Sequence, residues 1–294
     1  MKLAVSTYSL SRWRQEQRKT LEESIDWIAK AGVQGVEFAG LDDQPPADPV
    51  KRAQALRAHC RNAGLEIPSY CVGGEFLVPP AEQRSVVEQV KRHVDVAAAL
   101  GVRSMRHDVT RGPKDGDKRT VAQVLAVVAP AVREVSEYAK TLGVITSVEN
   151  HGFYLQTAER VEALVKAVKL ANFRVTLDMG NFLCLDQDPV AAVAKLAKYA
   201  VMVHAKDFHS RPKKRTPPTG WFATPKTIAL RGAIVGHGVI DVPAQIKLLK
   251  RAKYDHFLSL EFEGIEEPTA GITLGLNYLR QLLGEKSSTA TAAS

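Results

Sequence analysis

Four metal-competent side chains stand at the ends of four consecutive strand-like runs in the second half of the chain. They are Glu149 in ITSVENHG, Asp178 in VTLDMGN, His204 in VMVHAKD and Glu261 in LSLEFEG. An acidic side chain inside an apolar strand destabilises the fold unless it is paired with a cation or binds a metal. Three carboxylates and one imidazole that meet at one point would hold one divalent cation, with Mn²⁺ or Mg²⁺ favoured and Co²⁺ or Zn²⁺ as alternatives. A polar network without a ligand is the other interpretation.

The elements that must position these side chains alternate between strand and helix along the whole chain, which favours parallel β/α units. Helix-period segments separate the strands, and several end at a glycine, as at Leu100-Gly101. The eight predicted strands are Leu3–Tyr8, Gly35–Ala39, Ile67–Val72, Val102–Val109, Val144–Asn150, Arg174–Asp178, Ala200–Lys206 and Phe257–Glu263. Eight such units in 294 residues predict an α/β fold, a (β/α)₈ TIM barrel. Because the carboxyl ends of its strands share one face, the four side chains are expected to converge there.

We expect one domain over residues 1–284 and a flexible tail at 285–294. A long insert at about 207–241, rich in Pro, Gly and basic residues, interrupts the pattern after the seventh strand. Loops of this length in compact domains are usually functional or disordered. We expect its Arg211–Arg215 cluster and the Trp221-Phe222 pair to form a lid or a partner surface, with a disordered excursion as the alternative.

The composition places the protein among globular chains, with 45% hydrophobic residues and no run of membrane-spanning length. The N-terminus resembles a first strand more than a signal peptide. Three cysteines without CxxC spacing indicate free thiols in a reducing compartment, so we expect a cytoplasmic protein. The net charge of +8 lies largely in surface helices and in the Arg211–Arg215 cluster, and we expect neither nucleic acid nor membrane as a partner.

Strand alternation adds further candidates, because residues two apart share a face. His151 then shares a face with Glu149 and is a candidate substrate contact. Lys206 shares a face with His204, and it either holds a substrate oxygen or pairs with carboxylates in the barrel mouth. Glu263, two residues after Glu261, is expected to be a rim residue that holds a loop.

Two earlier strand ends also carry polar side chains. Glu37 ends the second strand and Arg106-His107-Asp108 ends the fourth. His107 is interpreted as a base or a substrate ligand, with a core histidine as the alternative. Glu37 and His107 are therefore added to the predicted substrate-binding residues.

The runs VENHG, LDMGN, VHAKD and LEFEG, in this order and at these spacings, resemble the xylose isomerase-like sugar isomerase/epimerase superfamily. The resemblance implies that Glu149, Asp178, His204 and Glu261 are metal ligands and that Glu149 and Glu261 are also the acid/base pair. Asn181 stands where many ketose epimerases of the superfamily have a histidine, and we expect it to contact substrate. Gly236-His237-Gly238 is similar to the family's GxGxxD turn, with Asp241 as its acid, so His237 is placed near the mouth or in a plain turn.

The resemblance implies an enzyme: a divalent-metal-dependent isomerase or epimerase of a keto-sugar or cyclitol, with Mn²⁺ as the first choice of metal, that removes and returns a proton next to a metal-bound carbonyl. The alternative is a metal-dependent lyase or dehydratase acting on a 3-keto-glycoside or an inosose. The basic insert and the EFEG run resemble, more loosely, the barrel subunit of C-glycoside-cleaving lyases, and this resemblance would imply a hetero-complex with a small β-rich subunit. Otherwise we expect a homo-oligomer with a small-molecule sugar substrate. A DNA-repair endonuclease is disfavoured because Asn181 removes a histidine that its three-metal site requires. A sugar-sensing barrel is disfavoured because both acid/base carboxylates are present.

Overall fold

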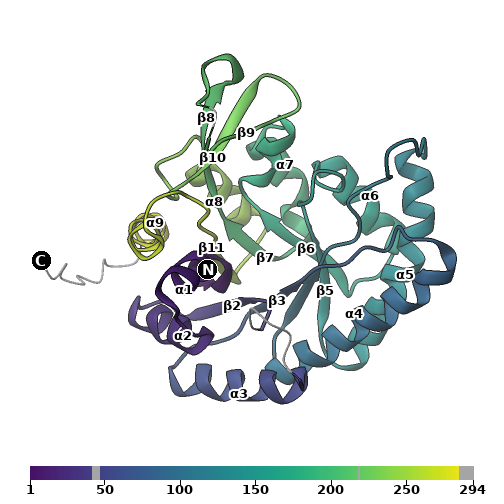
Figure 1. Ribbon diagram of the computed structural model, residues 1–294, viewed down its shortest axis with the longest axis horizontal. Helices are drawn as coiled ribbons and strands as arrows, with labels where there is room; N and C mark the ends of the chain where they lie inside the picture. The colour runs from purple at the N-terminus through teal and green to yellow at the C-terminus, as the bar shows by residue number, and fades with distance from the viewer. Residues whose placement is uncertain (42–46, 218, 285–294) are drawn as a thin grey trace, which may run out of the picture.

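The strands form a closed parallel barrel in a computed structural model that describes residues 1–41, 47–217 and 219–284 (Figure 1). The strand order around the barrel is β1-β11-β7-β6-β5-β4-β3-β2. The predicted TIM barrel is therefore confirmed. The barrel strands are β1 Lys2–Ser6, β2 Gly35–Ala39, β3 Ser69–Val72, β4 Ser104–His107, β5 Ile145–Glu149, β6 Phe173–Asp178, β7 Ala200–Ala205 and β11 Phe257–Leu260.

Helices surround the barrel, and their starts follow ordinary capping chemistry. Thr20 and Thr120 each form a capping box, with Glu23 and Gln123 respectively. Gly101 ends α4 at a φ of 74°, a conformation that glycine adopts without strain. The α-helices are α1 Ser11–Gln17, α2 Leu21–Lys30, α3 Pro49–Asn62, α4 Pro80–Leu100, α5 Val121–Thr141, α6 Ala158–Val168, α7 Pro189–Leu196, α8 Val242–Arg251 and α9 Pro268–Leu283. Short 3₁₀ helices are η1 Thr7–Leu10, η2 Asn181–Leu185, η3 Ala197–Tyr199 and η4 Lys213–Arg215.

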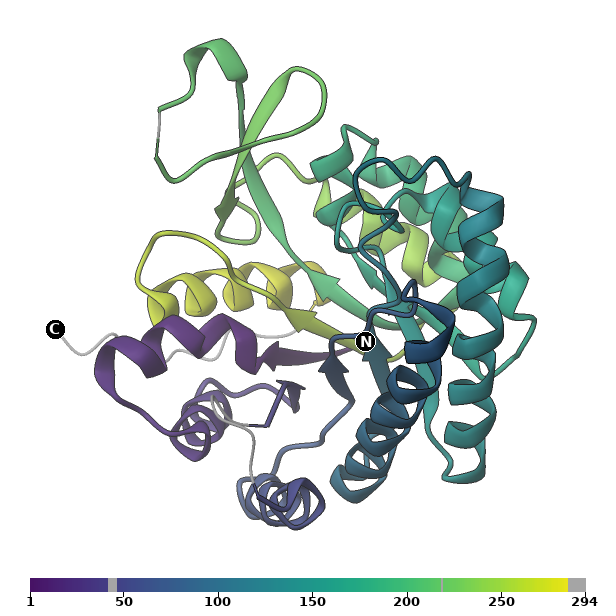
Figure 2. The ribbon, with the colours of Figure 1, turned by 45° about the vertical axis from the view of Figure 1, so that its right-hand side comes forward.

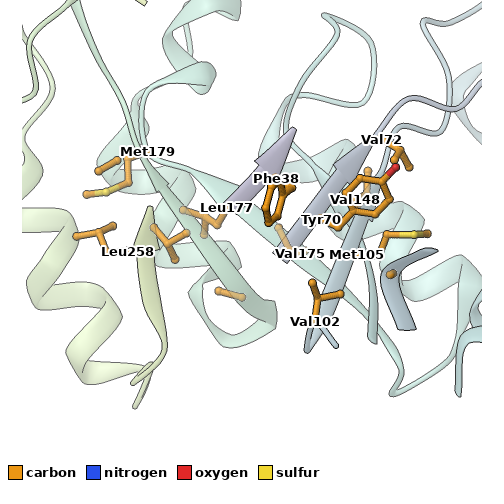
Figure 3. Close-up of a cluster of buried hydrophobic side chains, with 14 of the residues drawn as sticks. Phe38, Tyr70, Val72, Val102, Met105, Val148, Val175, Leu177, Met179 and Leu258 are labelled. Carbon is orange, nitrogen blue, oxygen red and sulfur yellow. The ribbon is translucent and has the colours of Figure 1, made fainter. Parts of the chain in front are cut away.

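Each barrel strand buries two different faces. The outer face is apolar and packs under the helices, as Tyr70, Met105 and Val148 do in the cluster of Figure 3. The inner face is small or polar: Ser69, Ser104, Ser147, Thr176 and Ser259 are all buried. A polar inner layer leaves room for charged side chains at the carboxyl ends of the strands. The side chains that face inward at these ends are Glu37, Arg106, Glu149, Asp178, His204 and Glu261, together with the thiol of Cys71.

The insert after β7 contains an antiparallel sheet, where the sequence analysis expected a long loop. It consists of β8 Asp207–Pro212, β9 Phe222–Ala223 and β10 Ile228–Ala233, in the order β8-β10-β9. We call residues 207–233 the arm. Figures 1 and 2 show the arm projecting outward from the barrel beside α7.

The two faces of the arm differ in chemistry. On one face, Phe208 and Leu230 pack with Cys184 of η2, and the ring of Phe222 lies 5.9 Å from that of Phe208. On the other face, the guanidinium groups of Arg211 and Arg231 lie 5.4 and 5.2 Å from the Trp221 ring. The arm is therefore an ordered element that is anchored on η2.

The tip of the arm offers a test of the predicted lid or partner role. We expect that replacing residues 213–227 with a short Gly-Ser link leaves the barrel and its metal content intact, because the cluster of Phe208, Leu230 and Cys184 remains. Substrate use or assembly should weaken. Circular dichroism, elemental analysis, steady-state kinetics and light scattering measure these four properties. Unchanged kinetics together with an unchanged oligomeric mass would rule out both roles.

Across the described ranges, none of the helices has the length and apolar character needed to cross a membrane. Cys60, Cys71 and Cys184 are buried free thiols. The predicted tail at 285–294 lies outside the described residues.

Candidate metal centre

The four side chains that opened the sequence analysis converge. One ligand atom from each of Glu149, Asp178, His204 and Glu261 lies within 4.8 Å of the others, and all four residues are buried. They come from β5, β6, β7 and the end of β11, which are neighbours in the barrel. Glu149 and Glu261 occupy the two ends of this arc, with Asp178 and His204 between them. The site is therefore a half-ring with its two glutamates on opposing sides.

His204 is oriented by a carboxylate on the opposite side of the barrel. Its Nε2 lies 3.0 Å from a carboxylate oxygen of Glu37. Its Nδ1 faces the cluster, 3.4 Å from Glu149 and 3.7 Å from Glu261. A carboxylate can only accept a hydrogen bond, so it fixes the proton on Nε2 and leaves Nδ1 for a metal. Glu37, which the sequence analysis placed with the substrate contacts, thus lies behind the imidazole as a positioning residue.

Asp178 uses one oxygen for the backbone and leaves the other for the cluster. Its Oδ1 accepts hydrogen bonds of 2.7 Å from the amides of both Gly180 and Asn181. Its Oδ2 points toward Lys206 Nζ at 3.4 Å. The turn that starts η2 therefore locks the carboxylate in place.

Asn181, at the start of η2, joins the same cluster. Its amide Nδ2 donates to Glu149 Oε1 at 3.2 Å, and its Oδ1 accepts from Lys206 at 3.4 Å. Asn181 is buried, and its two hydrogen bonds link Glu149 at the end of β5 with Lys206 directly after β7.

Each of the two opposing glutamates has its own cation. Arg106 Nε lies 3.0 Å from Glu149 Oε2, and Lys206 Nζ lies 2.6 Å from Glu261 Oε2. Lys206 also contacts Glu263 at 3.2 Å, so it pairs with carboxylates, which is one of its two predicted roles. Burial would raise the pKa of Glu149, but Arg106 and His204 hold that pKa well below its ordinary value.

Two ligand atoms lack the hydrogen bonds that buried polar atoms usually have. Asp178 Oδ2 and His204 Nδ1 are buried and make no hydrogen bond. Both face the cluster, where the Nζ of Lys206 lies 3.4 Å from Asp178 Oδ2. Such atoms are ready to bind a cation, and a donor set of three carboxylates and one imidazole suits a divalent ion. The residues present therefore fit a divalent metal ion.

His151 lies at the rim, in the loop after β5, with its Nδ1 3.4 Å from Asp108 Oδ1. That contact is the main reason why the pKa of His151 is raised. His151 and Glu149 both line a cavity of about 600 Å³ between the loops that follow β3, β4 and β5. This cavity adjoins the candidate metal centre and is large enough for a small molecule.

Two predicted residues do not reach the cluster. His107 is fully buried on the outer face of β4, with its ring 5.6 Å from that of Phe76 and 6.2 Å from that of Phe173. Neighbouring strand residues face opposite sides, so Arg106 enters the barrel and His107 does not. His237 is exposed in the turn before α8, whose Gly236 and Gly238 amides donate to the buried Asp207. His107 is therefore a core histidine here, and His237 is a turn residue.

Metal binding should depend on pH. Burial opposes the charged imidazole, yet Glu37, Glu261 and Glu149 raise the pKa of His204 well above its ordinary value. Burial also raises the pKa of Asp178 to about 6. Both protons must leave before these groups bind a cation, so affinity should fall as pH falls, by about tenfold per unit for each proton released.

Calorimetric titration with Mn²⁺ in two buffers of different ionisation enthalpy counts these protons. We expect about one proton released at pH 7 and a larger number below about pH 6, where Asp178 is also protonated. An affinity that does not change between these pH values would contradict the assigned ligands.

Glu37 offers a separate test of how the imidazole is held. Glu37→Gln keeps the size of the side chain but removes the charge behind His204. We expect metal affinity to fall by about 10–100-fold, the usual effect of losing an outer-shell partner. Competition with a chelator measures it, with Glu137→Gln on the surface of α5 as the matched control. Equal affinities in the two variants would exclude the positioning role of Glu37.

Comparison with known proteins places this geometry in context. A family model described as a xylose isomerase-like TIM barrel matches residues 25–282. No curated protein matches the chain. The family match covers most of the barrel and all four candidate ligands.

Among solved structures, the chain is similar to IOLI with a bound zinc atom, at 15% identity over 98% of this chain and 100% of that one, with a TM-score of 0.73. It is also similar to the probable 3-DHS dehydratase AsbF from Bacillus anthracis, at 17% identity over 98% and 100% of the two chains, with a TM-score of 0.73. A third is the apo 3-keto-D-glucoside 4-epimerase YcjR from E. coli, at 16% identity over 96% and 99%, with a TM-score of 0.72. At these identities the likeness is one of fold.

Proposed function

The chain belongs to the xylose isomerase-like TIM barrel family, and we propose that it is a divalent-metal-dependent isomerase or epimerase of a keto-sugar or cyclitol. The observation that carries the proposal is the convergence of Glu149, Asp178, His204 and Glu261 on one point, beside a cavity of about 600 Å³. Fold alone would not support an activity, because this architecture hosts many chemistries.

We propose that Glu149, Asp178, His204 and Glu261 hold the ion. When bound, it supplies a Lewis acid that makes the proton next to a substrate carbonyl easier to remove. Mn²⁺ is our first candidate because carboxylate oxygens dominate the ligand set, and a zinc-bound neighbour keeps Zn²⁺ as an alternative.

The chain's own residues would move the proton. Glu149 and Glu261 stand on opposing sides of the cluster, so one carboxylate can take a proton from one face of a substrate carbon and the other can return it to the opposite face. Arg106 and Lys206 each hold one of these carboxylates in place. Return to the opposite face of the same carbon gives epimerisation, and return to the neighbouring carbon gives isomerisation.

Substrate would enter from the cavity beside Glu149. His151 is half-exposed there and close to Asp108, so it is placed to donate to a substrate oxygen. Asn181 and Lys206 lie deeper and are proposed to hold substrate oxygens next to the carboxylates.

The second candidate is a lyase or dehydratase at the same site. It is favoured by the presence of a probable dehydratase among the similar structures, whereas the 3-keto-D-glucoside 4-epimerase among them favours the first candidate. Elimination needs the same proton removal, followed by loss of an oxygen substituent on the adjacent carbon. The two candidates therefore share residues and differ in their products.

Incubation of Mn²⁺-loaded protein with a panel of keto-sugars, 3-keto-glycosides and inososes in D₂O tests the proposal. An isomerase or epimerase should give a sugar of unchanged formula, with deuterium at one carbon in its NMR spectrum. A lyase should give an unsaturated product that absorbs in the ultraviolet. No conversion and no exchange with any member of the panel would contradict both candidates.

A further inference from the structure

A second cavity, of about 960 Å³, opens at the amino-terminal end of the barrel, opposite the candidate metal centre. Its floor contains apolar side chains, including Met202 and Phe257. Three arginines, Arg57, Arg61 and Arg103, line the same cavity. An apolar floor beside a cationic rim is an arrangement that the proposed chemistry at the other end does not use.

The charges around this cavity do not balance. Four cations line it, the three arginines and Lys2, against two carboxylates, Glu66 and Asp255. Glu66 already contacts Lys2 at 2.5 Å, and Asp255 lies 2.9 Å from the backbone nitrogen of Met1. Within the described ranges, none of the three arginines has a carboxylate within ion-pair distance. The rim therefore carries a positive surplus that the described side chains leave without a counter-charge.

Three segments of the chain place the arginines along the rim of this cavity. Arg57 and Arg61 are one turn apart on α3, so they share a face of that helix. A Cβ atom at Gly101 would lie 2.6 Å from Arg57 Cζ, so glycine at this position lets the guanidinium lie against the end of α4. Arg103 follows two residues later, and its Nη1 lies 3.0 Å from His256 Nδ1. These contacts bring α3, the end of α4 and the start of β4 to one rim.

His256 orients Arg103 without adding charge. Burial, followed by the charge of Arg103, lowers the pKa of His256, so its neutral ring accepts the hydrogen bond from the guanidinium. His256 thus holds the guanidinium of Arg103 in one orientation at the rim.

We propose that this cavity binds a small organic phosphate, with its phosphate group among Arg57, Arg61 and Arg103 and its body over the floor formed by Met202 and Phe257. Guanidinium groups present paired donors that match phosphate oxygens, and three of them can neutralise a doubly charged group. The competing role for Arg57 is purely structural, as a cation at the carboxyl end of α4.

Calorimetry with two probes, inorganic phosphate and phenyl phosphate, tests the proposal on the full chain. Both should bind saturably, and phenyl phosphate should bind about tenfold more tightly because its ring lies on the apolar floor. Arg57→Gln and Arg103→Gln should each weaken phenyl phosphate binding by at least about tenfold. Arg133→Gln, at a half-exposed arginine of α5 that pairs with Glu137 and lies outside the cavity, is the matched control and should leave binding unchanged.

Arg57→Lys separates binding from helix stabilisation, because it keeps the charge at the end of α4 and removes the paired donors. It should fold with the wild-type melting temperature and still lose part of the phosphate affinity. No saturable binding up to about 10 mM probe would overturn the proposal. So would equal affinities in Arg57→Gln and Arg133→Gln. Metal content is expected to stay unchanged in all these variants, so failure here is distinguishable from failure of the proposed enzymatic function.

Discussion

Glu261→Gln is expected to cut turnover by at least ~10²-fold, the usual scale for loss of a general acid or base. Glutamine has the same shape but cannot take a proton from the substrate or return one, and it loses the ion pair with Lys206, whose Nζ lies 2.6 Å from Glu261 Oε2. Glu149→Gln should have an effect of similar size, because Glu149 occupies the opposing side of the cluster. Steady-state kinetics with the substrate found in the panel measure both.

Glu263→Gln is the matched control for this experiment. It is the same chemical change two residues away, on a carboxylate that also contacts Lys206, at 3.2 Å, but lies outside the four-residue cluster. Its effect should remain well below that of Glu261→Gln. Full activity of both Glu149→Gln and Glu261→Gln would remove the assignment of these residues as the acid/base pair.

Asp178→Asn is expected to lose the metal and with it all measurable turnover. The asparagine Oδ1 can still accept from the amides of Gly180 and Asn181, so the turn should keep its structure. The uncharged amide cannot replace the buried Oδ2 that faces the cluster. The loss in affinity should exceed the 10–100-fold typical of residues that only support a ligand.

Asp188→Asn provides the control for Asp178→Asn. Asp188 caps α7 by accepting from the amide of Val190, and asparagine caps helices about as well as aspartate. This variant should keep both metal and melting temperature. If Asp178→Asn retained the metal as firmly as Asp188→Asn, the ligand set would have to be revised.

The barrel could be predicted because its signals are local. Every predicted strand range overlaps a strand of the barrel, since alternation of apolar and polar residues records which side chains face the helices. Convergence of Glu149 and Asp178 follows directly, because parallel strands end at one face. The end of a strand is harder to predict from the local pattern. The first predicted strand extended to Tyr8, but β1 ends at Ser6, because the Ser6 side chain accepts a hydrogen bond from the Tyr8 amide and caps η1.

Arg106 shows a signal that was present but not used. Met105 is the large apolar residue of β4 and marks the outer face, so His107 shares that face and Arg106 enters the barrel. Assigning the side chains of this strand to alternating faces would have selected Arg106, rather than His107, as the residue that faces the site.

Other parts of the site could not be predicted from local pattern. The contact between Glu37 and His204 joins residues 167 positions apart, through the closed barrel. The arm was expected as a long loop because Pro and Gly are frequent in its middle, while its short strands carry only brief alternation around Phe208 and Leu230. Its sheet is stabilised by contacts with Cys184 of η2, which no local sequence pattern indicates.

The metal content of purified protein tests the central claim most directly. Apo protein is reloaded with Mn²⁺, and the excess ion is removed. Elemental mass spectrometry should then find about one ion per chain, because one half-ring of four ligands converges on one point. Protein that holds no ion after reloading would contradict the account. Three ions per chain would contradict it as well, because the four ligands form a single site.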